Sequence, residues 1–230
     1  MMENFYAQLL SPHLPADKNI RILEIGCGMG FALAAMRQWG YSSLEGVDTH
    51  PDAVESCKAK NLDVFLVQDT VTFLSQRTRT YDLILALDLI EHLPCIDQLD
   101  FARAIQEALA PGGKLICTVP NANSALASRW RYIDWTHHIS FTEHSLDFLL
   151  HNAGFSDIRI LSSDAGGRFP YRHFFSRRFL EKNFWQDFLH HLIFKSVRFF
   201  RRLEMIAELG WNEGRPVPLS LNLLGIAVKK

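Results

Sequence analysis

The chain has 230 residues with a formal net charge of −1, and 48% of its residues are hydrophobic. This composition excludes an intrinsically disordered chain, and the near-neutral charge gives no support for general nucleic-acid binding. The four cysteines form no CxxC pair, and neither a signal peptide nor an apolar run long enough to cross a membrane is visible. We therefore expect a single cytoplasmic domain over residues 1–230.

Short apolar runs alternate with helical patterns in the first half of the chain. Because these runs are continuously apolar, the strands are expected to be buried on both faces, which is typical of a parallel sheet. This order predicts a Rossmann-like, doubly wound α/β fold. The predicted strands are 20–25, 44–47, 64–67, 83–87 and 114–119. The predicted helices are 30–39, 51–60, 71–77 and 98–109, the last one capped by Asp97 and stopped by Pro111-Gly112-Gly113.

The pattern changes after the fifth predicted strand. Residues 120–141 are predicted to be irregular, and Thr142 to cap a helix that runs to Leu150. Further strands are predicted over 158–161 and 221–228. The long stretch between these two strands predicts a helical insertion over 165–220.

Glycines and acids follow the predicted strands. The segment Leu23-Glu24-Ile25-Gly26-Cys27-Gly28-Met29-Gly30 joins the first strand to the first helix, and Phe31 stands where a dinucleotide fingerprint needs glycine. Glu24 is suited to a cationic ammonium group, Asp48 to ribose hydroxyls and Asp69 to an adenine amino group. Any one acid is equally well explained as a helix cap, but acids at the ends of successive parallel strands indicate a nucleoside-binding edge.

These segments resemble the class I S-adenosylmethionine-dependent methyltransferases, within the group that includes ubiquinone-biosynthesis O-methyltransferases and bacterial glycan and small-molecule methyltransferases. The matching segments are ILEIGCGMG, GVD, YDLILALDLIEHL, LAPGGKL and DWTHHISFTEHSLDFLLHNAGF. The resemblance implies a seven-stranded sheet whose last strand is antiparallel. It also implies that S-adenosylmethionine is bound. By this resemblance, the methionine part of the cofactor would be lined by Glu24, Gly26, Cys27, Gly28 and Gly30. The ribose would be held by Asp48 with Thr49, and the adenine would contact Asp69 and Thr70. The sulfonium would be flanked by Leu87 and Asp88.

Methyl transfer to a hydroxyl group needs alignment and a base, and histidine suits that role near neutral pH. The candidate catalytic residues are His137, His92 and Asp88, and the resemblance favours His137 as the base. A structural role remains open for His137 and for His138. Asp88, Glu91 and His92 are also suitable ligands for a divalent metal, although the sequence favours a reaction without one.

Residues around the irregular segment are the candidate acceptor site. The candidates are Asn121, Arg129, Tyr132, Trp135 and His138, and packing within the loop is the alternative for them. The predicted acceptor is a small molecule, a glycan or a lipid-linked compound, methylated on oxygen. Two other functions remain open, namely a nicotinamide-dependent oxidoreductase and a methyltransferase-like binding module without activity.

Basic and aromatic residues are interleaved over 172–202. Their helical spacing predicts an amphipathic helix. The favoured interpretation is a lid or a homodimer element whose apolar face packs on protein. The alternative is peripheral contact with the inner face of the membrane, and nucleic-acid contact is the least supported.

Overall fold

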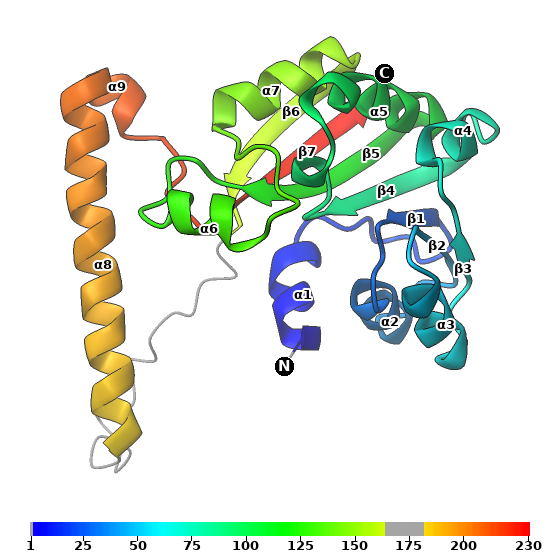
Figure 1. Ribbon diagram of the computed structural model, residues 1–230, viewed down its shortest axis with the longest axis horizontal. Coiled ribbons are helices and arrows are strands. Elements are labelled where there is room, and N and C mark those ends of the chain that lie inside the picture. The colour runs from blue at the N-terminus through cyan, green and yellow to red at the C-terminus, as the bar shows by residue number, and fades with distance from the viewer. Residues whose placement is uncertain (1, 164–181) are drawn as a thin grey trace.

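The computed structural model describes residues 2–163 and 182–230, and these form a seven-stranded sheet with the order β3-β2-β1-β4-β5-β7-β6 (Figure 1). The strands are β1 (Arg21–Ile25), β2 (Ser43–Asp48), β3 (Val64–Leu66), β4 (Tyr81–Leu87), β5 (Leu109–Pro120), β6 (Phe155–Ser162) and β7 (Asn222–Lys229). Strands β1 to β5 pair in parallel, whereas β7 runs antiparallel to both β5 and β6. The predicted sheet with an antiparallel last strand is confirmed.

Helices cover both faces of the sheet (Figure 1). One face carries α1 (Met2–Leu10), α2 (Phe31–Gln38) and α3 (Pro51–Ala59), and the other carries α4 (Thr70–Ser75), α5 (Cys95–Ala108) and α7 (Glu143–Asn152). Neighbouring residues of a strand point to opposite faces. Leu83 is therefore buried in the cluster under α2, and Ile84 in the cluster under α5. This double burial explains why the strands read as continuous apolar runs.

The N-terminal boundary of α5 differs from the prediction. The helix begins at Cys95, directly after Pro94, and Asp97 lies inside its first turn rather than at the cap. Proline suits a helix start because the missing N–H would have no partner there. The C-terminal stop also differs, since β5 already begins at Leu109 and pairs with Tyr81. The Pro111-Gly112-Gly113 turn therefore interrupts a strand, with Gly112 at a φ of 75°.

The segment between β5 and β6 contains one helix that the sequence did not predict. Helix α6 (Ala127–Ile133) buries none of its residues, so it leaves no apolar periodicity to detect. Helix α7 follows as predicted, because the Thr142 and Ser145 side chains form a reciprocal capping box. Gly154, at a φ of 95°, ends this helix.

The segment between β6 and β7 contains α8 (Lys182–Leu209) and the short α9 (Trp211–Gly214). Figure 1 shows α8 standing apart from the layered sheet and helices. The predicted basic aromatic segment is described only from residue 182 on, and residues 172–181, with Arg172, Arg177 and Arg178, lie outside the described residues. In the described ranges, no helix has both the length and the apolar character that crossing a membrane requires.

Candidate functional site

The loop between β1 and α2 takes a conformation that needs glycine at three positions. Gly26, Gly28 and Gly30 have φ values of 68°, 50° and 71°, which lie in the left-handed region. A Cβ on Gly26 or Gly30 would collide with neighbouring side chains, whereas a Cβ on Gly28 would meet no atom within 4 Å. The loop therefore leaves open space in front of Gly28, which suits the close approach of a ligand.

Asp48, at the end of β2, holds this loop. Its Oδ2 accepts a hydrogen bond from the Gly28 backbone N–H at 2.8 Å, and its Oδ1 accepts one from the His50 N–H at 2.9 Å. The Asp48 side chain is only 9% exposed. Its carboxylate thus lies directly beside the glycine loop, at the edge where the sequence analysis expected a ribose.

Glu24, near the end of β1, is a buried acid with an unsatisfied oxygen. The residue is 4% exposed, and within the described structure its Oε2 has no hydrogen-bond partner. Burial raises the pKa of Glu24 to about 8, although a hydrogen bond from the Leu33 backbone N–H opposes the shift, and the charge of Asp48 adds to it. A carboxylate in this position is costly unless a cation or a donor reaches it.

The remaining cofactor candidates have different surroundings. Asp69 caps α4 by accepting from the Thr72 backbone N–H at 3.0 Å, as the alternative interpretation of this acid expected. Thr70 is the first residue of α4, and Thr49 is exposed beside His50. Cys27 is buried under the loop, where burial raises the pKa of its thiol. Leu87 is the last residue of β4.

Asp88 follows β4 in a left-handed conformation, with a φ of 49°. The Thr118 hydroxyl and the Asn222 side-chain amide both donate to its Oδ1, at 2.9 Å and 2.6 Å. Three strands therefore combine to orient this carboxylate, namely β4, β5 and β7. Neither Thr118 nor Asn222 could be identified from the sequence, because their pairing with Asp88 depends on the order of the strands.

His137 has one ring nitrogen fixed as a donor. Its Nδ1 lies 2.8 Å from the backbone carbonyl oxygen of Trp130, and a carbonyl oxygen can only accept. The proton of the neutral ring is therefore on Nδ1, which leaves Nε2 as an unprotonated base. The His137 ring also packs edge-on against His92, with ring centroids 4.6 Å apart.

His92 is oriented by a short chain of hydrogen bonds. The Thr136 hydroxyl donates to Asp134 Oδ1 at 2.7 Å, so its oxygen accepts from His92 Nδ1, also at 2.7 Å. The Nε2 of His92 is consequently unprotonated as well. Burial lowers the pKa of His92, and the neighbouring His137 adds to the effect. The sequence analysis did not assign Thr136 or Asp134 this role.

Glu91 completes a cluster with the two histidines. It lies in the 3₁₀ helix η1 (Ile90–His92), is 1% exposed, and has an Oε2 without a partner in the described structure. Burial raises the pKa of Glu91 to about 8, with a further contribution from the charge of Asp88. Ligand atoms of Glu91, His92 and His137 lie within 4.8 Å of one another. The structure thus joins His137, rather than the expected Asp88, to Glu91 and His92.

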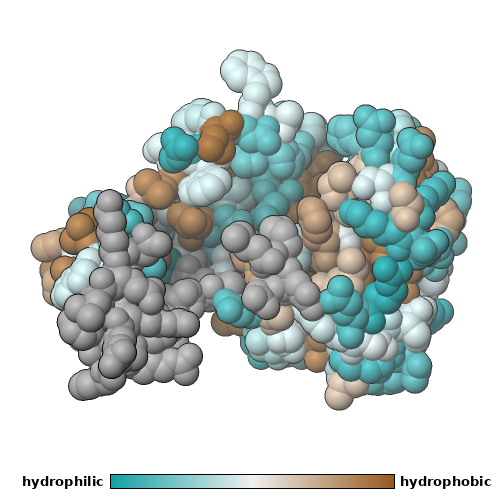
Figure 2. Space-filling model, turned by 90° about the horizontal axis from the view of Figure 1, so that it is seen from below, coloured by the Kyte–Doolittle hydropathy of each residue, from teal (hydrophilic) through white to brown (hydrophobic). Residues whose placement is uncertain are grey.

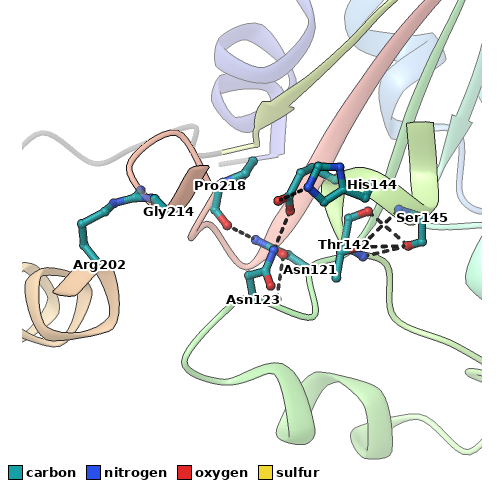
Figure 3. Close-up of polar contacts among 9 residues, drawn as sticks. Asn121, Asn123, Thr142, His144, Ser145, Arg202, Gly214 and Pro218 are labelled. Carbon is teal, nitrogen blue, oxygen red and sulfur yellow. Dashed lines mark hydrogen bonds and ion pairs between the residues drawn. The ribbon is translucent and has the colours of Figure 1, made fainter. Parts of the chain in front are cut away.

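The acceptor candidates are divided between a buried asparagine and exposed loop residues. Asn121 is 1% exposed, and its amide nitrogen donates to the carbonyl oxygen of Pro218 at 2.9 Å (Figure 3). The same nitrogen donates to the carbonyl oxygen of Ser220, also at 2.9 Å. Its contacts therefore tie β5 to the segment before β7. The other four candidates are exposed at the surface: Arg129, Tyr132, Trp135 and His138.

Tyr6 on α1 was not a candidate from the sequence, but it interacts with two acids of the candidate site. Burial, together with the charges of Glu24 and Asp88, raises the pKa of the Tyr6 hydroxyl to about 12. Tyr6 therefore lies near both acids. The sequence offers no signal for Tyr6, because no helix was predicted over α1 and no local motif links Tyr6 to the acids that follow β1 and β4.

Comparisons with known proteins agree with this geometry. The family model described as a methyltransferase domain matches residues 2–160. The ubiquinone biosynthesis O-methyltransferase of Cereibacter sphaeroides is 30% identical over 118 residues, which are 50% of this chain and 46% of that protein. The same enzyme of Xanthomonas oryzae pv. oryzae is 27% identical over 110 residues, 46% of this chain and 45% of that protein. The chain spans about half the length of the curated relatives that it matches.

Two solved structures have a similar fold. A SAM-dependent methyltransferase from Archaeoglobus fulgidus has a TM-score of 0.68 at 21% identity, over 100% of this chain and 95% of that one. Phosphoethanolamine N-methyltransferase 2 of Haemonchus contortus, in complex with S-adenosyl-L-methionine, has a TM-score of 0.60 at 18% identity, over 98% of this chain and 52% of that one.

Proposed function

The chain belongs to the methyltransferase domain family of S-adenosylmethionine-dependent enzymes, and from this membership we propose that it transfers a methyl group to an oxygen atom of a small-molecule or glycan acceptor, with His137 as the base. The observation that carries the proposal is the unprotonated Nε2 of His137, which its hydrogen bond to Trp130 fixes. When bound, S-adenosylmethionine supplies an activated methyl group on a sulfonium. The protein then has to align the acceptor and remove its proton.

The glycine loop fits the cofactor. Open space lies in front of Gly28, Asp48 is held beside the loop, and Glu24 has a buried oxygen without a partner in the described structure. We assign the methionine part of the cofactor to Glu24, Gly26, Cys27, Gly28 and Gly30, the ribose to Asp48 and Thr49, and the adenine to Asp69 and Thr70. Leu87 and Asp88 are assigned to the sulfonium. An ammonium group near Glu24 would compensate its buried charge.

Glu24 makes cofactor binding dependent on pH. The pKa of Glu24 is raised from 4.5 to about 8. Between these values the folded protein keeps a proton on Glu24 that the unfolded chain has lost. The free energy of unfolding therefore falls as the pH rises through this range. A cationic ligand favours the carboxylate, so binding at pH 7 should release a proton. We expect the affinity to rise with pH up to about 8. In Glu24→Gln it should be weaker by about 10- to 100-fold and independent of pH.

Calorimetry in two buffers with different ionisation enthalpies measures this proton release. The wild-type protein should give different apparent binding enthalpies in the two buffers, and Glu24→Gln the same enthalpy in both. A wild-type enthalpy that equals the Glu24→Gln value in both buffers would contradict the assignment of Glu24 to the cofactor.

The proposed base acts without a metal ion. Nε2 of His137 takes the acceptor proton, and the neighbouring Glu91, with its pKa near 8, is mostly protonated at pH 7. His92, His137 and Glu91 are nevertheless suitable ligands for a divalent cation. The Nδ1 atom of each histidine already has a hydrogen-bond partner, so both Nε2 atoms are available to bind a metal.

Turnover after chelation separates the two roles of this cluster. We expect S-adenosylhomocysteine formation with a hydroxylated acceptor to continue at an unchanged rate after dialysis against a chelator. A loss of turnover that Mn²⁺, Mg²⁺ or Zn²⁺ restores would assign Glu91, His92 and His137 to a metal site instead. Failure to form S-adenosylhomocysteine with any hydroxylated acceptor, in a protein that binds the cofactor, would contradict oxygen methylation.

The acceptor should enter beside α6. Four exposed side chains lie there and are accessible to a molecule that binds: Arg129, Tyr132, Trp135 and His138. Asn121 has both amide protons engaged within the chain, so we assign it to support of this region rather than to the acceptor. Charged and aromatic side chains of this kind suit an anionic or sugar-like group.

A further inference from the structure

Helix α8 carries a row of exposed apolar side chains. Each is between 45% and 67% exposed, and we call them the outer stripe: Leu189, Leu192, Ile193, Phe199, Phe200 and Leu203. Leu189, Leu192, Phe199 and Leu203 follow one another at spacings of three, four or seven residues, which places them on one face of a helix. In the described part of the chain, this apolar face is not packed on protein as a lid would be. Figure 2 shows hydrophobic residues at the left edge of the molecule, over α8.

Two arginines of α8 that lie outside the stripe contact the rest of the chain. Arg202 Nη1 donates to the Gly214 carbonyl oxygen at 2.8 Å, and Figure 3 shows this side chain reaching from α8 toward Gly214. Arg201 Nε donates to the Asn123 carbonyl oxygen at 3.3 Å. Phe199 and Leu203 are two residues from Arg201 in either direction, and therefore lie roughly 160° around the helix from it. The outer stripe thus faces away from the sheet.

We propose that the outer stripe binds the surface of a bilayer that contains anionic phospholipids, with α8 lying parallel to the membrane. At 1.5 Å per residue the helix is about 42 Å long, and its many charged residues suit the membrane surface rather than the membrane interior. The stripe holds aromatic and branched aliphatic residues, which partition into the headgroup region. This surface is independent of methyl transfer, so the two proposals stand or fall separately.

The charges beside the stripe favour lipid over a second copy of the chain. Lys195 and Arg202 are seven residues apart and border the stripe on the same side. Lys195 is exposed, and the guanidinium of Arg202 uses one of its donors on the Gly214 carbonyl oxygen. If two α8 helices paired through their stripes in antiparallel orientation, Lys195 and Arg202 of one helix would meet the same cations of the other. In parallel orientation, these cations would meet Ile193 and Phe200 instead. Neither arrangement gives them an acidic partner. Lipid phosphates do, because they lie at the level where long basic side chains emerge from an apolar surface.

Binding in this orientation would direct the candidate site toward the membrane. The carboxyl ends of β4 and β5 point to the side of the molecule where α6 and α8 lie (Figure 1). Helix α6 and the loop after it expose further apolar residues there, with Tyr132 at 77% and Trp135 at 98% exposure. An acceptor held at the membrane surface would therefore have a short path to the glycine-loop edge.

Flotation with phospholipid vesicles tests the proposal on the full chain. The stripe variant is the double substitution Leu192→Glu with Phe199→Glu. The control is Phe194→Glu, because Phe194 is 45% exposed on the same helix but lies roughly 140° around it from Phe199. Both variants are expected to fold, since all three side chains are exposed, and calorimetry with S-adenosylmethionine checks this.

We expect the wild-type protein and Phe194→Glu to float with vesicles of phosphatidylcholine and phosphatidylglycerol. The partitioning of the wild-type protein should fall at least about tenfold when the vesicles contain phosphatidylcholine alone. The partitioning of the stripe variant onto the mixed vesicles should also be lower by at least about tenfold. A wild-type protein that stays in the lipid-free fraction, or a stripe variant that floats equally well, overturns the proposal. The proposal is also overturned if the wild-type protein is a dimer in the absence of lipid and the stripe variant is a monomer, because a second copy of the chain would then cover the stripe.

Discussion

Replacing His137 with alanine should lower turnover by about 10²- to 10⁴-fold and leave the affinity for S-adenosylmethionine unchanged. This is the usual contribution of a positioned general base. The loss should appear in kcat because the role proposed for Nε2 is to take the acceptor proton and not to bind the cofactor. Single-turnover rates with saturating cofactor, together with calorimetry of cofactor binding, measure the two quantities separately.

His144→Ala is the matched control for this substitution. His144 is also near the acceptor side, on α7, but its side chain is 90% exposed and its described ion pair is with Glu143. We expect turnover within about twofold of wild type for this variant, as for most surface substitutions. If His137→Ala retains wild-type turnover, or loses cofactor affinity in proportion to its turnover, His137 is not the base.

Replacing Gly28 with alanine should weaken cofactor binding by about 10- to 100-fold. The added methyl group would enter the open space in front of the loop, and overpacking of this kind costs about 1–3 kcal/mol. The left-handed backbone, with a φ of 50°, adds about 1–2 kcal/mol of destabilisation in the free protein. Calorimetry measures the affinity, and thermal unfolding measures the stability.

Gly40→Ala separates the two contributions. Gly40 also has a left-handed backbone, with a φ of 91°, and a Cβ there would also meet no atom within 4 Å. It follows α2 at the opposite end from the glycine loop. We expect both variants to lose similar stability and only Gly28→Ala to lose affinity. Equal affinity in the two variants would show that the space in front of Gly28 is not the cofactor site.

The fold of the first 120 residues follows from burial patterns that a sequence displays directly. The apolar runs of β1 and β4 are long and bounded by turns, so their positions are predicted within a residue or two. Helices α1 and α6 were missed because α6 buries nothing and α1 is a single short helix at one end of the chain. Neither produces a repeated pattern that stands out from its surroundings.

The candidate site could be predicted where it depends on single positions and not where it depends on contacts across the fold. The three glycines lie within five residues of one another and Asp48 ends the next predicted strand, and the structure brings them together. The hydrogen-bond chain from Asp134 through Thr136 to His92 joins residues more than 40 positions apart. No local pattern encodes such a pairing. The same reason explains why the donor set contains His137 in place of Asp88.

The bond between Asn222 and Asp88 has a consequence for the order in which activity arises during synthesis. The glycine loop and Asp48 emerge from the ribosome early, whereas the carboxylate at the end of β4 gains one of its two side-chain donors only when β7 has been inserted between β5 and β6. Under the proposed assignment of Asp88 to the sulfonium, a chain without β7 would therefore have the glycine loop but lack one of the two side-chain donors that orient this carboxylate.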